Sequence, residues 1–204
     1  MKLNIMKKLF LMAFLPIIAL VIYSSNYLTQ KYSGLQKSEA SISKLNTLQL
    51  TSNLIHELQI ERGVSVSILN NVKNDYFSAL HKTQTTKTDT RILQFTSHLQ
   101  HAQLLKTSQT SLPILHKIKD SLQNIHTYRD LLKSNQIDSQ EIFDYFTTIN
   151  ADLISLFSSL KLFSYLHTRD TDISSLISLI KLQELAGQER ALVAKLIVSP
   201  DITA

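Results

Sequence analysis

The sequence is poor in the residues that make turns. Its 204 residues contain three glycines, three prolines and no cysteine. A sheet protein needs turns at short intervals, so this composition argues against a sheet protein and favours long helices with short connections. The absence of cysteine fits an oxidising compartment.

Motifs of common catalytic and cofactor sites are also missing. The chain has no Gly-rich phosphate loop, no nucleophile elbow and no zinc-ligand spacing, so we predict neither an enzyme nor a cofactor. His98 and His101 stand one helix turn apart, but the Glu-x-x-His pair of di-iron bundles is absent. We interpret these histidines as surface residues and predict no metal site. The formal net charge of +5 is mild and the lysines are scattered, which indicates no nucleic-acid surface.

The amino end combines positive charge with an apolar run. Three lysines among the first eight residues precede an uncharged run from Leu9 to Tyr23. A spanning helix needs about 20 residues, and snorkelling lysines and the flanking tyrosines extend this run. A cleaved signal peptide is the alternative, although the small residues of a cleavage site are poorly supplied. We predict a single-pass anchor at residues 1–30 in the bacterial cytoplasmic membrane, and an extracytoplasmic, periplasmic domain at residues 31–204.

Five helices are predicted after the anchor, and no strand pattern competes with them. Hydrophobic periodicity and capping signals place them at about 34–70, 75–106, 111–133, 138–169 and 171–199. Asp138, three residues before Glu141, has the spacing of a helix cap. We therefore predict an all-α fold, an up-and-down helical bundle into which the membrane helix continues directly.

Two of these helices carry an arginine on an apolar stripe. Residues spaced by three and four between Leu48 and Val72 include Arg62, and a similar stripe between Leu176 and Ile197 includes Arg190. Both stripes predict an arginine that points into the core. Each arginine follows a glutamate and lies close to a glycine, Gly63 or Gly187. A glycine destabilises a helix relative to alanine, and the compensating gain is either close helix packing or room for a ligand.

A guanidinium suits a flat oxyanion because it presents five donors in a planar fork and keeps its charge. Two arginines from two helices would hold one anion between them. The ordinary alternative is that each buried arginine pairs with a carboxylate. The chain offers Glu57, Glu61, Asp144, Asp152, Glu184 and Glu189 for that purpose.

The segments HELQIERG (56–63) and GQERAL (187–192) resemble the nitrate- and nitrite-sensing (NIT) domain of bacterial receptors and antiterminators. Residues 129–132 and 145–147 look like the middle section of that family. The resemblance runs from about Leu48 to the last residue. It implies a pair of four-helix bundles, the second of them incomplete in this chain, and an anion site to which Arg62 and Arg190 contribute.

The resemblance implies a sensory region that binds nitrate or nitrite and transmits a helix displacement to an output module outside this chain. Receptors of this construction are usually homodimers. Candidate secondary contacts to the anion are Gln59, Ser65, Gln183 and Gln188. Two alternatives stay open: a non-sensing helical scaffold in which both Glu-Arg pairs are structural, and a sensor for another small anion.

The predicted topology has a direct test. Alkaline phosphatase fused after Lys106 should be active, because the enzyme requires an extracytoplasmic location and the basic amino end should stay inside. A cytoplasmic reporter that is active at the same position would contradict the prediction.

Overall fold

The computed structural model describes residues 5–70, 75–101, 112–159 and 170–198. These residues form five helices: α1 (Ile5–Asn70), α2 (Asp75–His101), α3 (Leu112–Lys133), α4 (Ser139–Ser159) and α5 (Asp170–Val198). The described residues contain no strand, so the predicted all-α class is confirmed.

Contacts divide the chain into two units, Met1–Ser43 and Lys44–Ala204. In the first unit the large apolar side chains that the structure describes, from Phe14 to Ile42, are exposed along α1. Within the described ranges, no helix is both long and apolar enough to cross a bilayer. The predicted boundary at residue 30 stays a prediction.

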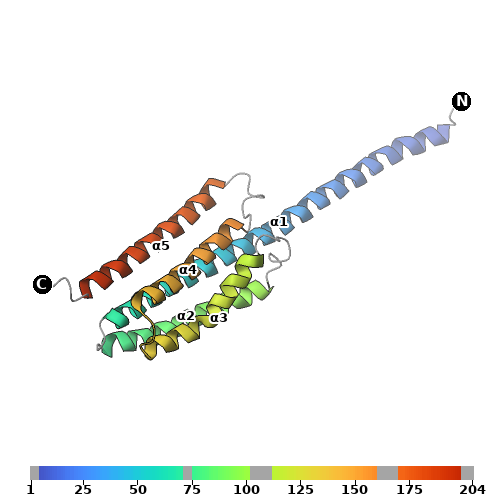
Figure 1. Ribbon diagram of the computed structural model, residues 1–204. Helices are drawn as coiled ribbons and strands as arrows, with labels where there is room; N and C mark the ends of the chain where they lie inside the picture. Colours follow the sequence, from blue (N-terminus) through green and yellow to red (C-terminus); the bar gives the residue numbers. More distant parts are fainter. Residues whose placement is uncertain (1–4, 71–74, 102–111, 160–169, 199–204) are drawn as a thin grey trace. The chain divides into compact units, whose positions relative to one another are not determined.

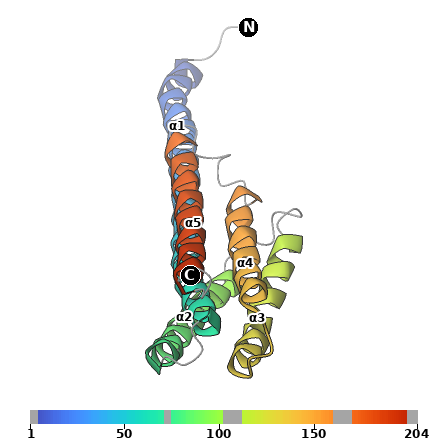
Figure 2. The same ribbon diagram turned by 60° about the vertical axis from the view of Figure 1, so that its left-hand side comes forward.

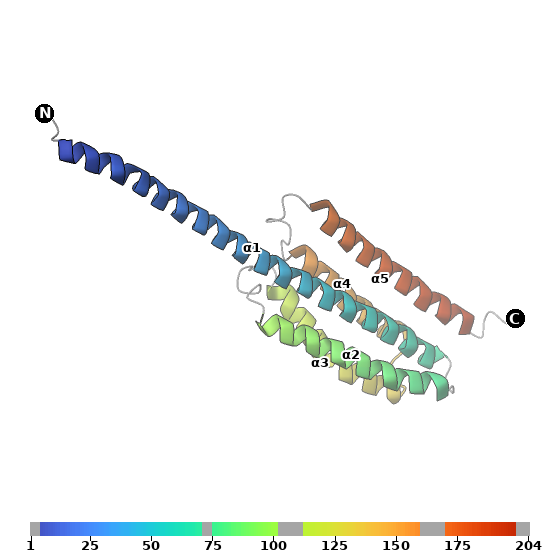
Figure 3. The same cartoon turned by 180° about the vertical axis from the view of Figure 1, so that it is seen from behind.

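The second unit is a bundle of long helices. Successive helices run in alternate directions (Figure 1), as expected for an up-and-down arrangement with short connections. Helix α3 packs against α4, and α4 packs against α5 (Figure 2). Residues 44–70 of α1 lie between α5 on one side and α2 on the other (Figures 1 and 3). Helix α1 therefore packs between α2 and α5.

One apolar cluster fills the bundle, and every helix contributes to it. Full burial of a side chain of this size stabilises a fold by roughly 1.5–3 kcal/mol, so these positions define the packing of the five helices. Members that are 0–8% exposed include Leu54, Leu58, Phe95, Ile125, Phe146, Ile149, Leu153, Ile177 and Ile180.

The connection between α3 and α4 follows the predicted cap. Asn135 has φ 54°, a left-handed conformation that ends α3. The Oδ1 of Asp138 accepts hydrogen bonds from the backbone nitrogens of Gln140 at 2.8 Å and Glu141 at 2.7 Å. Asp138 is thus confirmed as the N-cap of α4.

The interpretation of His98 as a surface residue needs a correction. His98 is half-buried, and its Nε2 hydrogen-bonds to Thr47 Oγ1 of α1 at 2.8 Å. A polar side chain at a helix contact is retained because its partner replaces the lost water. The side chain of His101 lies outside the described residues.

The two helical glycines differ in their surroundings. A Cβ on Gly187 of α5 would lie 3.2 Å from Nη2 of the buried Arg62 and 3.3 Å from Cδ of Gln59. A glycine at position 187 therefore allows the close approach of α5 to α1 without displacing Arg62 or Gln59. A Cβ on Gly63 would meet no atom within 4 Å, so the predicted packing role has no contact to support it there.

This difference predicts opposite effects of alanine at the two glycines. Gly63→Ala should raise the free energy of unfolding by up to about 1 kcal/mol, the helix-propensity gain. Gly187→Ala should lower it, because the added methyl group would press on Arg62, whose hydrogen bonds hold it in place. Urea unfolding of both variants measures the two values, and equal stabilisation by both would contradict the close contact at Gly187.

Candidate functional site

Arg62 lies in the core of the second unit, and none of its side chain is exposed. Its Nη1 donates hydrogen bonds to Glu184 Oε1 at 2.6 Å and to Thr147 Oγ1 at 2.9 Å. Its Cζ lies 5.1 Å from the centre of the Phe143 ring. These partners belong to α5 and α4, so one guanidinium connects three helices. Such a buried charge is tolerated only when it is paired and hydrogen-bonded.

The carboxylate of Glu184 is surrounded by donors. Oε1 accepts hydrogen bonds from Arg62 Nη1 and from Gln188 Nε2 at 2.9 Å. Oε2 accepts from Gln59 Nε2 at 2.8 Å and from Asn150 Nδ2 at 2.9 Å. Glu184 is only 5% exposed. Each carboxylate oxygen thus receives two hydrogen bonds, which replace the water that a buried carboxylate loses.

One edge of the Arg62 guanidinium is unpaired. Nε and Nη2 are buried, and neither has a hydrogen-bond partner among the described residues. These two nitrogens form the side edge that donates two parallel hydrogen bonds to a flat oxyanion. Gly187 lies next to Nη2, as the position of its absent Cβ shows. A buried donor left unpaired costs about 1–3 kcal/mol, so an acceptor placed at this edge would be stabilising.

Arg190 is exposed, so the predicted inward stripe of α5 is wrong. Its Nε donates to Ala186 O of the same helix at 3.3 Å, and Leu179 and Val193 of the predicted stripe are exposed as well. The spacing does not distinguish the faces of α5 because apolar residues occur all round this helix. Because Glu184 pairs with the buried Arg62, the face of α5 that carries Glu184 is the buried one. The buried residues of that face are Ile177, Ile180, Glu184, Gly187 and Ala191.

The other predicted contacts have different positions. Gln59 and Gln188 both donate to Glu184 and so belong to the network around Arg62. Ser65 is buried, and its Oγ has no hydrogen-bond partner within the described ranges. Gln183 is half-buried.

The structure adds two residues that the sequence did not single out as contacts, Thr147 and Asn150 of α4. They lie three positions apart and thus on one face of the helix. This spacing, and for Thr147 the resemblance of residues 145–147 to the family, are the signals that could have found them.

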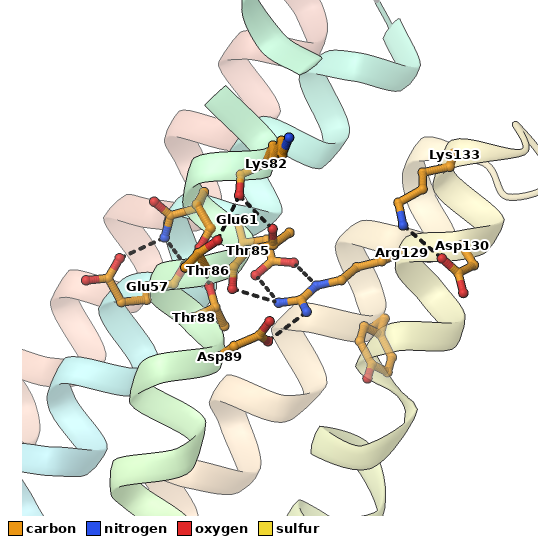
Figure 4. Close-up of polar contacts among 12 residues, drawn as sticks. Glu57, Glu61, Lys82, Thr85, Thr86, Thr88, Asp89, Arg129, Asp130 and Lys133 are labelled. Carbon is orange, nitrogen blue, oxygen red and sulfur yellow. Dashed lines mark hydrogen bonds and ion pairs between the residues drawn. The ribbon is translucent and has the colours of Figure 1, made fainter. Parts of the chain in front are cut away.

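A second buried ion pair involves the neighbour of Arg62. Glu61 is fully buried, and its two oxygens accept from Arg129 Nε at 2.7 Å and Nη2 at 3.0 Å. Arg129 Nη1 donates to Asp89 Oδ1 at 2.7 Å. Figure 4 shows Arg129 of α3 reaching between Glu61 and Asp89. The glutamate of the first Glu-Arg pair therefore neutralises Arg129 and leaves Arg62 to Glu184.

Electrostatics around Arg129 follow from this pairing. Burial alone lowers the pKa of Arg129, but the hydrogen bonds and charges of Glu61 and Asp89 outweigh burial and raise the pKa above its ordinary value.

Arg129 and Asp89 also line a cavity of about 830 Å³ together with His81. Burial lowers the pKa of His81, Glu61 opposes this effect, and the charges of Arg129 and Lys133 add to it. Burial and the two cations therefore favour the neutral imidazole of His81.

No curated protein and no solved structure matches the chain. A family described as nitrate and nitrite sensing matches residues 53–204, a range that includes Arg62, Arg129, Glu184 and Arg190. The match covers well over half of the sequence, and the chain therefore belongs to the nitrate- and nitrite-sensing family.

Proposed function

We propose that this chain is the ligand-binding region of a bacterial membrane receptor and that it binds nitrate or nitrite at Arg62. The observation that carries the proposal is the unpaired Nε and Nη2 edge of a fully buried guanidinium, in a chain of the nitrate- and nitrite-sensing family. A planar, singly charged oxyanion matches the two parallel donors of this edge. A neutral ligand would leave the same donors without a charged acceptor.

Arg190 is the second arginine of the proposed site. It follows Gly187 by three residues, one turn of α5, and Gly187 lies against Arg62. A change of rotamer would bring the long Arg190 side chain from solvent toward the anion. Two guanidinium charges about 6 Å apart repel by about 3 kcal/mol at an effective dielectric near 20. An anion between the two guanidinium groups makes the net interaction attractive. The movement of Arg190 toward Arg62 therefore depends on the bound ligand.

Neutral donors complete the proposed site. Gln59 and Gln188 already donate to an oxyanion, the Glu184 carboxylate, and could extend the same donors to a ligand. Ser65 and Gln183 are further candidates on α1 and α5. Selectivity for planar anions would follow from the fixed fork of Arg62 against the Phe143 ring.

The response that we propose is a displacement of α5 relative to α1 and α4. The partners of Arg62 lie on α4 and α5, so an anion at this position changes contacts between three helices. Couplings of this type are typically about 1–3 kcal/mol. We propose that an output module outside this chain reads the displacement. The basic and apolar amino end supports an anchor at residues 1–30 and a periplasmic location for the rest of the chain. A homodimer, the usual state of receptors of this construction, completes the proposal.

A structural scaffold is the second candidate function. Its supporting observation is that Arg62 is already paired with Glu184, as a purely structural buried ion pair would be. A sensor of another small anion, such as an organic acid, would use the same residues. The two candidates and the nitrate sensor differ in what stabilises the folded chain.

Thermal unfolding of the 204-residue chain tests the proposal. Nitrate should raise the melting temperature relative to chloride at equal ionic strength, since a ligand at a hundredfold excess over its Kd stabilises the folded form by about 2.7 kcal/mol. Arg62→Ala and Arg190→Ala should abolish the shift. Arg62→Lys should not restore it, because an ammonium lacks the planar fork.

Arg91→Ala is the matched control, because Arg91 lies on α2 with its side chain 37% exposed and should leave the nitrate shift intact. A wild-type chain that responds equally to nitrate and chloride, with Arg62→Ala destabilised in both, would support the scaffold. A shift with acetate or formate but not with nitrate would keep the site and change the ligand.

A further inference from the structure

The Glu184 carboxylate is bound by a full set of hydrogen-bond donors that would suit a planar oxyanion. Four side-chain donors from three helices converge on its two oxygens, two on each. A carboxylate and a nitrite ion share the features that such donors recognise, namely one negative charge and two oxygens in a plane. We infer that the Glu184 carboxylate is a built-in competitor and that nitrate or nitrite binds by replacing it at Arg62, an inference that rests on the proposed function.

The charge balance of the site favours replacement over addition. Arg62 and Glu184 have side chains 0% and 6% exposed, and together they are neutral. A second anion beside Glu184 would leave a net negative charge in this buried region, which is strongly unfavourable. Arg190 is exposed in this structure, with its guanidinium in water, so it supplies no charge to the buried region when the anion first enters and can close only afterwards. Exchange of one anion for another keeps the buried region neutral.

The donor geometry also favours exchange. A nitrate ion at the position of the Glu184 carboxylate would keep the donors on Arg62 Nη1, Gln59 and Asn150. The unpaired Nε and Nη2 edge, which Glu184 does not reach, offers two further donors to an anion that is not tethered to α5. A free anion can therefore satisfy more of the buried donors than the Glu184 carboxylate does, and this difference supplies a driving force for displacement.

Replacement has a mechanical consequence for α5. Glu184 is the side chain of α5 that hydrogen-bonds to both α1 and α4, through Gln59, Arg62 and Asn150. Its release removes these connections. The rest of the buried face that the structure describes on α5 consists of Ile177, Ile180, Gly187 and Ala191, none of which has a polar side chain. Helix α5 is thus the element whose position changes when the anion enters.

Isothermal titration of the full chain with sodium nitrate tests the inference. Glu184→Gln keeps the size of the side chain and removes its charge, so it should bind nitrate about tenfold or more tightly than the wild type, within the usual range of such couplings. Without nitrate this variant should melt below the wild type, because Arg62 loses its counter-charge. Nitrate should restore most of that loss.

Glu61→Gln is the matched control. Glu61 is equally buried and equally paired with an arginine, but it lies against Arg129. This variant should also melt early, yet its nitrate affinity should equal that of the wild type and nitrate should not rescue it specifically. Glu184→Asp provides a second variant that keeps the charge but retracts it by one methylene group, and its nitrate affinity should lie between those of the wild type and Glu184→Gln.

The outcomes separate the inference from the proposed function. If the wild type binds nitrate but both Glu184 variants bind it equally or more weakly, Glu184 positions Arg62 and the competitor inference is overturned. If neither the wild type nor the variants bind nitrate above chloride, the proposed function itself fails and takes the inference with it.

Discussion

The packing of the bundle depends on how the charge of Arg62 is stabilised in its core. Arg62 has no exposed side-chain surface, so the fold must supply a counter-charge and hydrogen-bond acceptors in place of water. Glu184 of α5 and Thr147 of α4 do so for one nitrogen of the guanidinium. The remaining two nitrogens stay unpaired among the described residues. The same interaction therefore joins three helices and leaves a partly unsatisfied site, a combination that suits a sensor whose ligand must change helix contacts.

Glu61 and Arg62 place two buried ion pairs on neighbouring residues of α1. Successive residues of a helix project about 100° apart, so Glu61 faces Arg129 of α3 while Arg62 faces Glu184 of α5. Helix α1 is thus held electrostatically on two sides. The two ion pairs lie on different sides of the same helix turn and share no partner residue. This arrangement accounts for a Glu-Arg pair in the middle of an otherwise apolar stripe.

Much of the fold follows from the sequence, whereas the partners in the site do not. Periodicity around Arg62 predicts its burial, and the spacing of Asp138 predicts the start of α4, because both depend on residues within a few turns. The orientation of Arg190 is predicted wrongly, since α5 is apolar on all sides and its spacing leaves the buried face undetermined. Glu184 is one of six carboxylates that the sequence offers to the arginines. Its selection, and the contribution of Asn150, depend on packing between helices more than 30 residues apart.

Direct contact between Arg62 and the anion, as we propose, can be observed at the side-chain Nε–H resonance of Arg62. We would follow that resonance in the isotope-labelled full chain during a nitrate titration, with Arg62→Lys to assign it. We expect a large, saturable shift of the Arg62 signal with nitrate and none with chloride at equal ionic strength, because Nε gains an acceptor that it now lacks. An Arg62 signal that stays unchanged while nitrate binds elsewhere would show that Arg62 does not receive the anion.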